Sequence, residues 1–517
     1  MKRTTKLLAS LLAVGSSFAV NIGLAQDSET LFDENCAACH LEPTSDRTPS
    51  KDALGRFSNN SIYYALTEGL MQEQAAAMSD EQKRELVQYL TGREFNGASM
   101  ESLTACARSL DSLNLDLASN WNGWGNGAGN PRAQTDGTRI GVDNINSVEL
   151  AWAFGFEGAS VSRAQPTIVD GVMMLGSPHG TIYALDLESG CSHWTFPATA
   201  EVRGAMQVVY SDELEKALVV VADVSNRIYV LDALTGEKLW HDDVDPHPYA
   251  RSTGSPVVSG DKIFVPVSSV EVAVAGNPQH PCCTGRGNVA SYDLNTGEKL
   301  WHTYIMEEAK KVGETSIGTP ILAPAGAPIW DAPTIDTKRN LIYVGTGQNY
   351  TRPASDTSDA VIAFDMDTGE IEWVQQTQVN DAFTMACTMR NNPNCSDAGP
   401  DIDIGASIMS TTLSNGQDIL IAGSKGGTVY GLDPDADGKI LWQTQLGAGS
   451  SLGGVHWGMS FIGDIAYVPI SDRARPTYTD VSRKPGLHAL DMKTGEILWY
   501  IPAPKRCAAG MQGCGDS

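Results

Sequence analysis

The first residues that could do chemistry are two cysteines and a histidine near the N-terminus of this 517-residue chain. Cys36, Cys39 and His40 form a C-x-x-C-H motif, in which both thiols add to the vinyl groups of a heme and the histidine ligates the iron. Two methionines compete to be the opposite ligand. Met71 is preferred because it precedes a predicted helix on a loop, whereas Met78 occupies a position natural for a core side chain. The motif predicts a covalently bound heme c, with a disulfide or a zinc site as the alternative.

Two carboxylates and a lysine in the C-terminal half form a second candidate site. Asp401 and Asp403 stand two positions apart in GPDIDIG, so a strand would point both side chains the same way. That arrangement suits a general base beside a metal ligand, although a solvated turn also contains such residues. Lys425 opens a predicted strand in AGSKGGTVYGLD and could set a cation against an anionic ligand.

Further polar and aromatic candidates share one property, their position at the boundaries between sequence repeats. Each of them alone fits a structural role, but their convergence on the same connections favours a common cofactor site. They are Arg203, Arg286, Trp330, Gln348, Asn349 and Trp457, the last within the run GGVHWG at 453–458.

Cysteine spacing predicts disulfides. Cys282 and Cys283 are adjacent, and a bond between them would form a flat ring able to stack on a planar ligand, unless each is bonded elsewhere. The other cysteines outside the heme motif suggest two local loop staples and one longer link, but the connectivity stays open at this level. The suggested pairs are Cys387 with Cys395, Cys507 with Cys514, and Cys106 with Cys191.

A repeated unit must position these residues. It reads strand, Asp, turn, Thr-Gly-Glu or a variant, strand, Trp, which is a hairpin closed by a glycine turn. The spacing of the copies leaves room for four strands each and predicts a β-propeller, with the tryptophan of each copy packed between neighbouring blades. Six unrelated hairpins in a sandwich are the alternative. The copies end at Trp194, Trp240, Trp301, Trp373, Trp442 and Trp499.

The chain divides into four predicted segments. Residues 1–25 combine a basic start, a short apolar run and a small-residue exit, which predicts a cleaved secretory signal; a membrane anchor is the alternative. Residues 26–105 hold the heme motif and a helix that opens with the capping box Ser79 to Gln82. Residues 106–137, rich in Gly and Asn without an apolar period, are predicted to be a linker and propeller entry, and residues 138–517 hold the repeats.

Composition narrows the class of function. The chain has 36 Lys+Arg against 62 Asp+Glu, a formal net charge of -26, which repels nucleic acid and anionic membrane surfaces. Charged residues make up 19% and hydrophobic residues 42%, with 51 Gly and 25 Pro, so the chain is globular and turn-rich. Export to an oxidising compartment fits the ten cysteines.

The repeat resembles the tryptophan motif of the pyrroloquinoline-quinone (PQQ) alcohol dehydrogenases. The stretches CCTGRGNVASYDLNTGEKLW, WDAPTIDTKRNLIYVGTGQNYT, GPDIDIGAS and AGSKGGTVYGLDPD, with the N-terminal heme motif, are similar to the polyvinyl-alcohol-oxidising branch. The resemblance implies a periplasmic quinohemoprotein of the mainly β class, an eight-bladed-type propeller with an N-terminal α-helical cytochrome c domain. With six copies present, the propeller is expected to be incomplete, either truncated or open.

The resemblance also implies roles for individual residues. Asp401, with Asp403 as rival, would take the alcohol proton, and Lys425 would face the quinone oxygens. Gln348 or Asn349 would ligate calcium; Cys282 stands where methanol-oxidising relatives have a calcium-ligating glutamate. The residues implied to contact PQQ are Cys282, Cys283, Arg286, Arg203, Trp330 and Trp457.

The implied reaction is oxidation of secondary hydroxyls of polyvinyl alcohol to ketones. Electrons would pass from PQQ to the protein's own heme c and on to a separate cytochrome c, and the polymer would need an open groove over the propeller axis. Two alternatives remain from the sequence: a non-enzymatic propeller of the outer-membrane-assembly type, and an electron-transfer cytochrome whose incomplete propeller is inactive.

Overall fold

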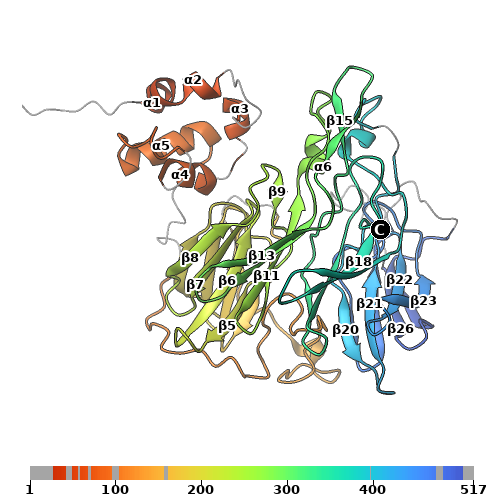
Figure 1. Ribbon diagram of the computed structural model, residues 1–517. Helices are drawn as coiled ribbons and strands as arrows, with labels where there is room; N and C mark the ends of the chain where they lie inside the picture. Colours follow the sequence, from red (N-terminus) through yellow and green to blue (C-terminus); the bar gives the residue numbers. More distant parts are fainter. Residues whose placement is uncertain are drawn as a thin grey trace, which may run out of the picture.

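Six antiparallel sheets stand side by side around a common axis in the computed structural model, as the repeat predicted (Figure 1). The structure describes residues 27–41, 49–55, 57, 59–67, 71–95, 104–156, 161–395, 398–472 and 481–504. The predicted signal at 1–25 and the predicted Cys507–Cys514 pair lie outside these residues. None of the helices within the described ranges is long and apolar enough to cross a membrane.

Each blade is a four-stranded meander in which consecutive strands pair. The first three blades are β1–β4 (Thr167–Val169, Val172–Gly176, Thr181–Asp186, Ser192–Pro197), β5–β8 (Gln207–Ser211, Lys216–Asp223, Arg227–Asp232, Lys238–Asp243) and β10–β13 (Val257–Ser259, Lys262–Ser269, Asn288–Asp293, Lys299–Tyr304). The last three are β16–β19 (Thr334–Asp336, Leu341–Gly345, Ala360–Asp365, Ile371–Gln376), β20–β23 (Met409–Thr412, Asp418–Gly423, Thr428–Asp433, Lys439–Gln445) and β24–β27 (Ser460–Ile462, Ile465–Ile470, Gly486–Asp491, Ile497–Pro502).

The regular spacing of the repeat has a structural cause that recurs in every blade. The register between the third and fourth strands shifts by a bulge just before the tryptophan, for example between Ala184 and Leu185. The tryptophan ring then covers the turn glycine of the next blade. A Cβ at that glycine would lie only 2.4 to 2.8 Å from the ring in the pairs Trp194–Gly236, Trp240–Gly297, Trp301–Gly369, Trp373–Gly438 and Trp442–Gly495.

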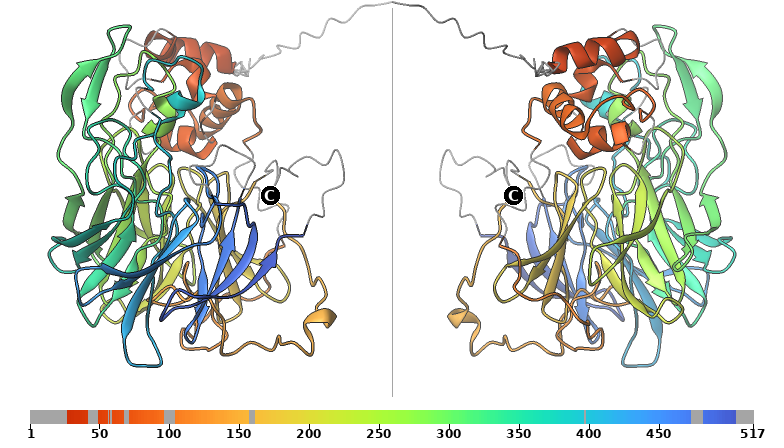
Figure 2. Two further views of the ribbon diagram at one scale, coloured as in Figure 1. Left: turned by 90° about the vertical axis from the view of Figure 1, so that its right-hand side faces the viewer. Right: turned by 90° about the vertical axis from the view of Figure 1, so that its left-hand side faces the viewer.

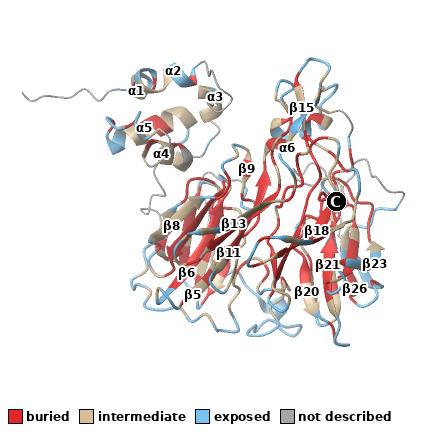
Figure 3. Cartoon of the chain, viewed as in Figure 1, coloured by how far each residue is buried: buried red, intermediate tan, exposed pale blue. Residues whose placement is uncertain are grey.

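The hydrophobic cores lie between neighbouring blades rather than within them. One cluster joins the first blade to the second, and four more join the following pairs in order. Figure 3 shows this burial along the central strands, with exposed turns at the ends of the sheets. Indole N–H groups add hydrogen bonds across the same joints, as from Trp194 to the Ala233 carbonyl at 3.0 Å.

The Gly- and Asn-rich stretch predicted to be a linker lies along the innermost strands of the propeller. We call residues 119–132 the axial segment. Its backbone bonds to Ile168 of β1, and its Asn122 side chain to the backbone of Val208 in β5. Its carbonyls accept from Ile335 in β16, Ser410 in β20 and Phe461 in β24. Five of the six blades therefore contact one short piece of chain, and the close approach explains its glycines, since a Cβ on Gly129 would lie 2.3 Å from a carbonyl oxygen.

The N-terminal residues form a small helical unit with its own core of Leu31, Phe32, Leu86 and Val87. Its helices are α1 (Ser28–Asn35), α2 (Ala37–His40), α3 (Lys51–Leu54), α4 (Asn59–Thr67) and α5 (Asp80–Thr91). The capping box at Ser79 is confirmed, because its side chain accepts from the Gln82 amide and the Gln82 side chain accepts in return.

The helical unit lies at the end of the propeller that also carries the inserted loops (Figures 1 and 2). These loops contain β9 (Ala250–Arg251), α6 (Glu271–Val274), the hairpin β14 (Lys310–Glu314) and β15 (Pro320–Ala323), and the 3₁₀ turn η2 (Met385–Thr388); another 3₁₀ turn, η1, spans Ile145–Ser147. Helix α4 meets the propeller directly. The Asn60 side chain donates to the His179 carbonyl at 2.9 Å, and the Arg227 guanidinium lies 4.1 Å from the Tyr64 ring centre.

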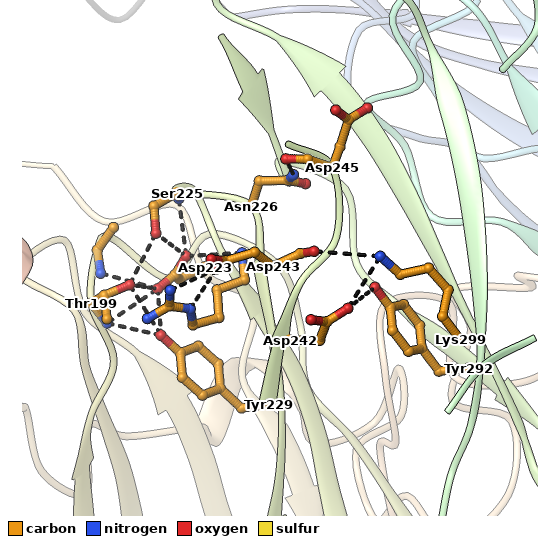
Figure 4. A network of polar contacts seen from close by, with 12 residues as sticks. Thr199, Asp223, Ser225, Asn226, Tyr229, Asp242, Asp243, Asp245, Tyr292 and Lys299 are labelled. Carbon is orange, nitrogen blue, oxygen red and sulfur yellow. Dashed lines mark hydrogen bonds and ion pairs between the residues drawn. The ribbon is translucent and has the colours of Figure 1, made fainter. Parts of the chain in front are cut away.

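A polar network stiffens the blade under α4 (Figure 4). The fully buried carboxylate of Asp223 accepts from the backbone and hydroxyl of Thr199, from Ser225 and from Tyr229. Arg227 is held by Asp243 at 2.6 Å. The platform that receives the helical unit is therefore held by bonds within the blade itself.

Three predicted disulfides are confirmed: Cys106–Cys191, Cys282–Cys283 and Cys387–Cys395. Cys36 and Cys39 are free thiols.

Candidate active site

A cavity of about 480 Å³ opens at the inserted-loop end of the propeller. We call it the central cavity. Its walls come from the connections that enter the second to sixth blades and from connections between the second and third strands, the positions where a propeller gathers its loops. The sequence candidates that line it are Arg203, Trp330, Gln348, Asp401, Asp403, Lys425 and Trp457. The structure therefore brings these residues together, whereas Arg286 and Asn349 do not line the cavity.

An ion triad forms one wall of the central cavity. The Lys425 ammonium lies 2.6 Å from Asp401 Oδ1 and 3.2 Å from Asp403 Oδ1. All three side chains are buried, so this charge arrangement has been taken out of water, which is costly unless each group has a partner. Such a group of charges in a cavity marks a functional site more often than a structural one.

Burial and mutual charge set the protonation of the triad. Burial raises the pKa of Asp401 well above its usual range, although Lys425 opposes this. Burial would also raise the pKa of Asp403, but the Lys425 cation keeps that pKa below its ordinary value. The two carboxyls act as a coupled pair in which Asp401 is the stronger proton acceptor.

The loop that carries the carboxylates is held from below. The buried Asp381 accepts from the backbone N–H groups of Asp401 and Ile402 at 3.1 and 3.0 Å. The backbone of Lys425 donates to the Asp403 carbonyl at 2.9 Å, which ties this loop to the next blade. Asp401 itself adopts φ +55°, a left-handed conformation that costs a non-glycine residue energy and therefore requires this support.

Trp330 forms a flat surface beside the triad. Its indole N–H donates to Asp403 Oδ2 at 3.0 Å, which fixes the ring. A Cβ on Gly405 would lie 2.0 Å from that ring, so only glycine fits beneath it. The Trp457 ring stands edge-on to Trp330 at 5.5 Å and is half exposed at the mouth of the cavity.

The vicinal disulfide and Arg286 are placed differently from the cavity residues. Cys282 and Cys283 are buried against Ala275, Ala325 and Tyr350, and none of the disulfide lines the central cavity. Arg286 stacks on Tyr304 and borders a separate space of about 30 Å³. The stacking of the disulfide on a planar ligand therefore stays a prediction.

A buried glutamate fixes the position of the loop that carries Cys282 and Cys283. Glu271 in α6 is fully buried and accepts from the backbone N–H groups of Thr284 and Gly285 at 2.8 and 2.5 Å. The His280 Nε2 atom lies 3.0 Å from Glu271 Oε1. These bonds draw the cysteine loop back onto α6. No feature of the sequence marked Glu271, because a lone glutamate after a strand is ordinary in composition.

The donor groups do not assemble a calcium site. Gln348 lines the cavity, but its side-chain nitrogen donates to the Phe383 carbonyl; Asn349 is fully buried, with its oxygen bonded to Ser355. Lys425 is already paired with both aspartates. Across the described residues there is no group of three or more His, Cys, Asp or Glu side chains that could hold a metal ion. The predicted Gln348 and Asn349 ligation of calcium therefore does not fit this arrangement.

A planar polyanionic quinone fits the cavity better. Arg203 lines it without an ion pair among the described residues, and burial lowers its pKa, which Glu201 opposes only in part. Trp330 offers a flat face, and Lys425 a second cation. The volume also matches a ligand of that size.

The helical unit holds the heme motif in a suitable geometry. The His40 side chain is buried in α2, and its Nδ1 bonds to the Pro49 carbonyl at 2.7 Å. That bond orients the ring and leaves Nε2 for iron, the outer contact typical of metal-ligating histidines. The half-buried Met71 packs with Cys36 in the same cluster, whereas Met78 is buried in the core; ligation by Met71 stays a prediction.

Comparison with known proteins identifies the class. Residues 121–389 match the family model "Glucose/ethanol/alcohol dehydrogenase, beta-propeller domain" for PQQ, and residues 323–503 match that of "Outer membrane protein assembly factor BamB". Solved structures share the fold at 19% identity: a quinohemoprotein alcohol dehydrogenase, ADHIIG, from Pseudomonas putida HK5 (TM-score 0.54, 75% of this chain and 72% of that chain) and a europium-containing methanol dehydrogenase (TM-score 0.55, 75% and 79%). Fold and cavity thus define a quinoprotein dehydrogenase of the PQQ β-propeller class.

Two relatives extend over nearly the whole chain. Polyvinylalcohol dehydrogenase of Pseudomonas sp is 34% identical over 96% of this chain and 79% of its own length. That of Sphingopyxis sp. (strain 113P3) is 32% identical over 92% and 76%. The chain belongs to the polyvinylalcohol dehydrogenase family and is a PQQ-dependent alcohol oxidoreductase.

Proposed function

We propose that this protein is an exported quinohemoprotein that oxidises secondary hydroxyls of polyvinyl alcohol or a similar alcohol to ketones. Electrons pass from PQQ in the central cavity to a heme c in the helical unit, and then to a separate cytochrome c. The observation that carries the proposal is the buried triad of Asp401, Asp403 and Lys425 beside Trp330 in a cavity that opens at the end bearing the helical unit.

Each cavity residue has a proposed role that follows from its chemistry. PQQ, when bound, supplies the oxidant that accepts the hydride equivalent of the alcohol carbon. Asp401, whose burial raises its pKa, takes the hydroxyl proton, and Asp403 holds Trp330 and Lys425 in place. Lys425 places a positive charge where negative charge develops during the reaction, and Arg203 attracts an anionic ligand.

The heme part of the proposal rests on the helical unit. Cys36 and Cys39 form no disulfide and lie on the same short stretch as His40, whose ring is oriented by Pro49. Three disulfides within the described chain agree with export to an oxidising compartment such as the periplasm, as the basic and apolar residues 1–25 predict.

The experiment uses the purified holo-cytochrome loaded with PQQ. A secondary alcohol or polyvinyl alcohol is added, and the visible spectrum of the heme is followed. Alcohol-dependent heme reduction is expected. A folded, PQQ-loaded protein whose heme stays oxidised would refute the enzyme proposal for this substrate class.

The second candidate function is suggested by the match of residues 323–503 to the outer-membrane assembly factor model. That role would not use the buried triad or the free thiols of the heme motif. If alcohol oxidation fails while PQQ and heme are both bound, an assembly role becomes the better candidate.

A further inference from the structure

His456 has no part in the roles described so far, yet it lines the central cavity. It lies in the GGVHWG run, in the connection that leads to β24. Its ring contacts Trp330 on one side, with centres 5.7 Å apart, and Trp457 on the other at 4.9 Å. The two indoles therefore clamp the imidazole at the boundary between the ion triad and the mouth of the cavity.

The hydrogen-bonding capacity of His456 is unused. Within the part of the chain that the structure describes, neither ring nitrogen has a hydrogen-bond partner. By comparison, Asp401 and Asp403 are paired with Lys425, and the Gln348 side chain donates to a backbone carbonyl. Both ring nitrogens are therefore available to a ligand in the cavity.

The charged groups around His456 keep it neutral. Burial and the Lys425 cation lower its pKa to about 4, and the Asp403 carboxylate opposes this only in part. A neutral imidazole offers one N–H donor and one nitrogen acceptor. A hydroxyl group has the matching acceptor and donor.

We infer that His456 binds a hydroxyl of the alcohol substrate and selects for it. The flanking indoles suit the carbon chain that carries this hydroxyl, since Trp457 is half exposed at the cavity mouth and Trp330 lies deeper. An anionic group of a cofactor would instead be drawn to Arg203 and Lys425, which carry full positive charge. The inference rests on the proposed function and names the residue that recognises its substrate.

The first experiment measures binding without turnover. Protein free of PQQ cannot oxidise an alcohol, so 2,4-pentanediol and a short polyvinyl alcohol oligomer serve as probes, with tryptophan fluorescence as the signal because Trp330 and Trp457 flank His456. In His456→Leu the dissociation constant is expected to rise about tenfold, the effect of one buried hydrogen-bonding group. In His456→Gln, which keeps a donor and an acceptor, most of the affinity should return.

The second experiment separates recognition from chemistry in the PQQ-loaded protein. His456→Leu should raise KM for the diol about tenfold and change kcat much less, because the Asp401–Lys425 pair is intact. His193→Leu is the matched control: His193 is a partly buried histidine in β4 that does not line the central cavity, so the KM of this variant should match wild type.

Three results would overturn the inference. Equal diol affinity in wild type, His456→Leu and His456→Gln would show that the ring meets no hydroxyl. Weaker PQQ binding in His456→Leu with unchanged diol affinity would assign the ring to the cofactor. If His456→Leu lowers the affinity for the diol and His456→Gln does not restore it, the ring has a packing role. Failure of the proposed function looks different, because wild-type protein would then leave the heme oxidised while the fluorescence assay still reports on His456.

Discussion

At the scale of single residues, the central cavity concentrates charge that stability alone would not favour. Replacing a buried ion pair by apolar side chains is often neutral or stabilising, so keeping Asp401, Asp403 and Lys425 out of water indicates a chemical role. The left-handed backbone at Asp401 agrees with this, since strain of that kind persists only where neighbouring bonds enforce it.

Removing the proposed base should remove catalysis and leave binding. Asp401→Asn keeps the shape of the side chain and cannot accept the hydroxyl proton, so we expect alcohol-dependent heme reduction to slow about 10²- to 10⁴-fold. PQQ affinity, measured by titration of the quinone, should stay within about threefold of wild type. Unchanged rates would assign the proton to Asp403 or Asp381.

The pH profile should identify the coupled partner. The negative charge of Asp403 raises the pKa of Asp401, because two nearby carboxylates resist simultaneous ionisation. In Asp403→Asn the acidic limb of kcat/KM against pH should therefore move to lower pH. A limb that stays in place, or moves upward, would contradict the assignment of Asp401 as the base.

The candidate site was predictable where the residues sit at equivalent positions of the repeat. Asp401, Lys425 and Trp330 all occupy blade connections, so the period itself brings them to one end. Glu271 and the placement of the Cys282–Cys283 loop were not predictable, because both depend on bonds between α6 and a loop of irregular length. No sequence period records such a contact.

At the scale of elements, the joint between blades is a tryptophan that covers a glycine. Gly369 has φ +72°, and a Cβ there would lie 2.5 Å from the Trp301 ring. Gly369→Ala must therefore strain the backbone and separate the two blades. We expect a loss of at least about 2 kcal/mol in the free energy of unfolding, measured by denaturant titration.

A second glycine provides the control for that joint. Gly171 has nearly the same φ, +76°, but a Cβ added there would have no neighbouring atom within 4 Å. Gly171→Ala should cost only the backbone strain, about 1 kcal/mol. Equal losses in the two variants would mean that the tryptophan contact adds nothing to the joint.

A turn at the last blade should make stability depend on pH. Bonds from Lys493 and Ser414 lower the pKa of Asp464 to about 2, and this carboxylate links the β24–β25 turn to the β20–β21 turn. Because the pKa is depressed on folding, the stabilisation is present above the unfolded value of about 3.9 and is lost as pH falls toward about 2.

Denaturant midpoints of wild type and Asp464→Asn check this dependence. The gap between them should be largest near neutral pH and should narrow below about pH 4. Asp143→Asn, at an exposed carboxylate in the connection before the first blade, should match wild type throughout. A gap that widens in acid would show that the link does not depend on the ionised carboxylate.

The elements themselves were largely predictable, and their arrangement was not. Hairpin, turn glycine and tryptophan recur within each copy, so the six blades follow from local sequence. Residues 119–132 have no apolar period, and their partners, such as Ser410, are far along the chain. Composition could identify them only as irregular, because their backbone bonds go to strands that no local pattern connects with them.

At the scale of the whole molecule, the helical unit meets the propeller through side chains of α4. One of these contacts is that of the Arg227 guanidinium with the Tyr64 ring. In Tyr64→Leu that attraction is lost without changing any tryptic cleavage site. Trypsin should then release the helical unit several-fold faster than from wild type. The release is measured by gel electrophoresis.

The control for docking is an aromatic residue elsewhere on the same blade. Tyr210 in β5 is exposed and has no described contact with the helices, so Tyr210→Leu should be cleaved at the wild-type rate. Equal release from Tyr64→Leu and wild type would mean that other contacts hold the unit. Faster heme reduction by small reductants in Tyr64→Leu, with slower reduction by alcohol, would tie docking to electron transfer.

The axial segment has a consequence for the order in which this molecule is made. Residues 119–132 leave the ribosome before any blade, and five blades later bond to them. Five of the sheets can thus bond to a stretch of backbone that precedes them in the chain, while each core forms against the preceding sheet. A propeller that grows blade by blade along this segment can begin to assemble before its last strand is made.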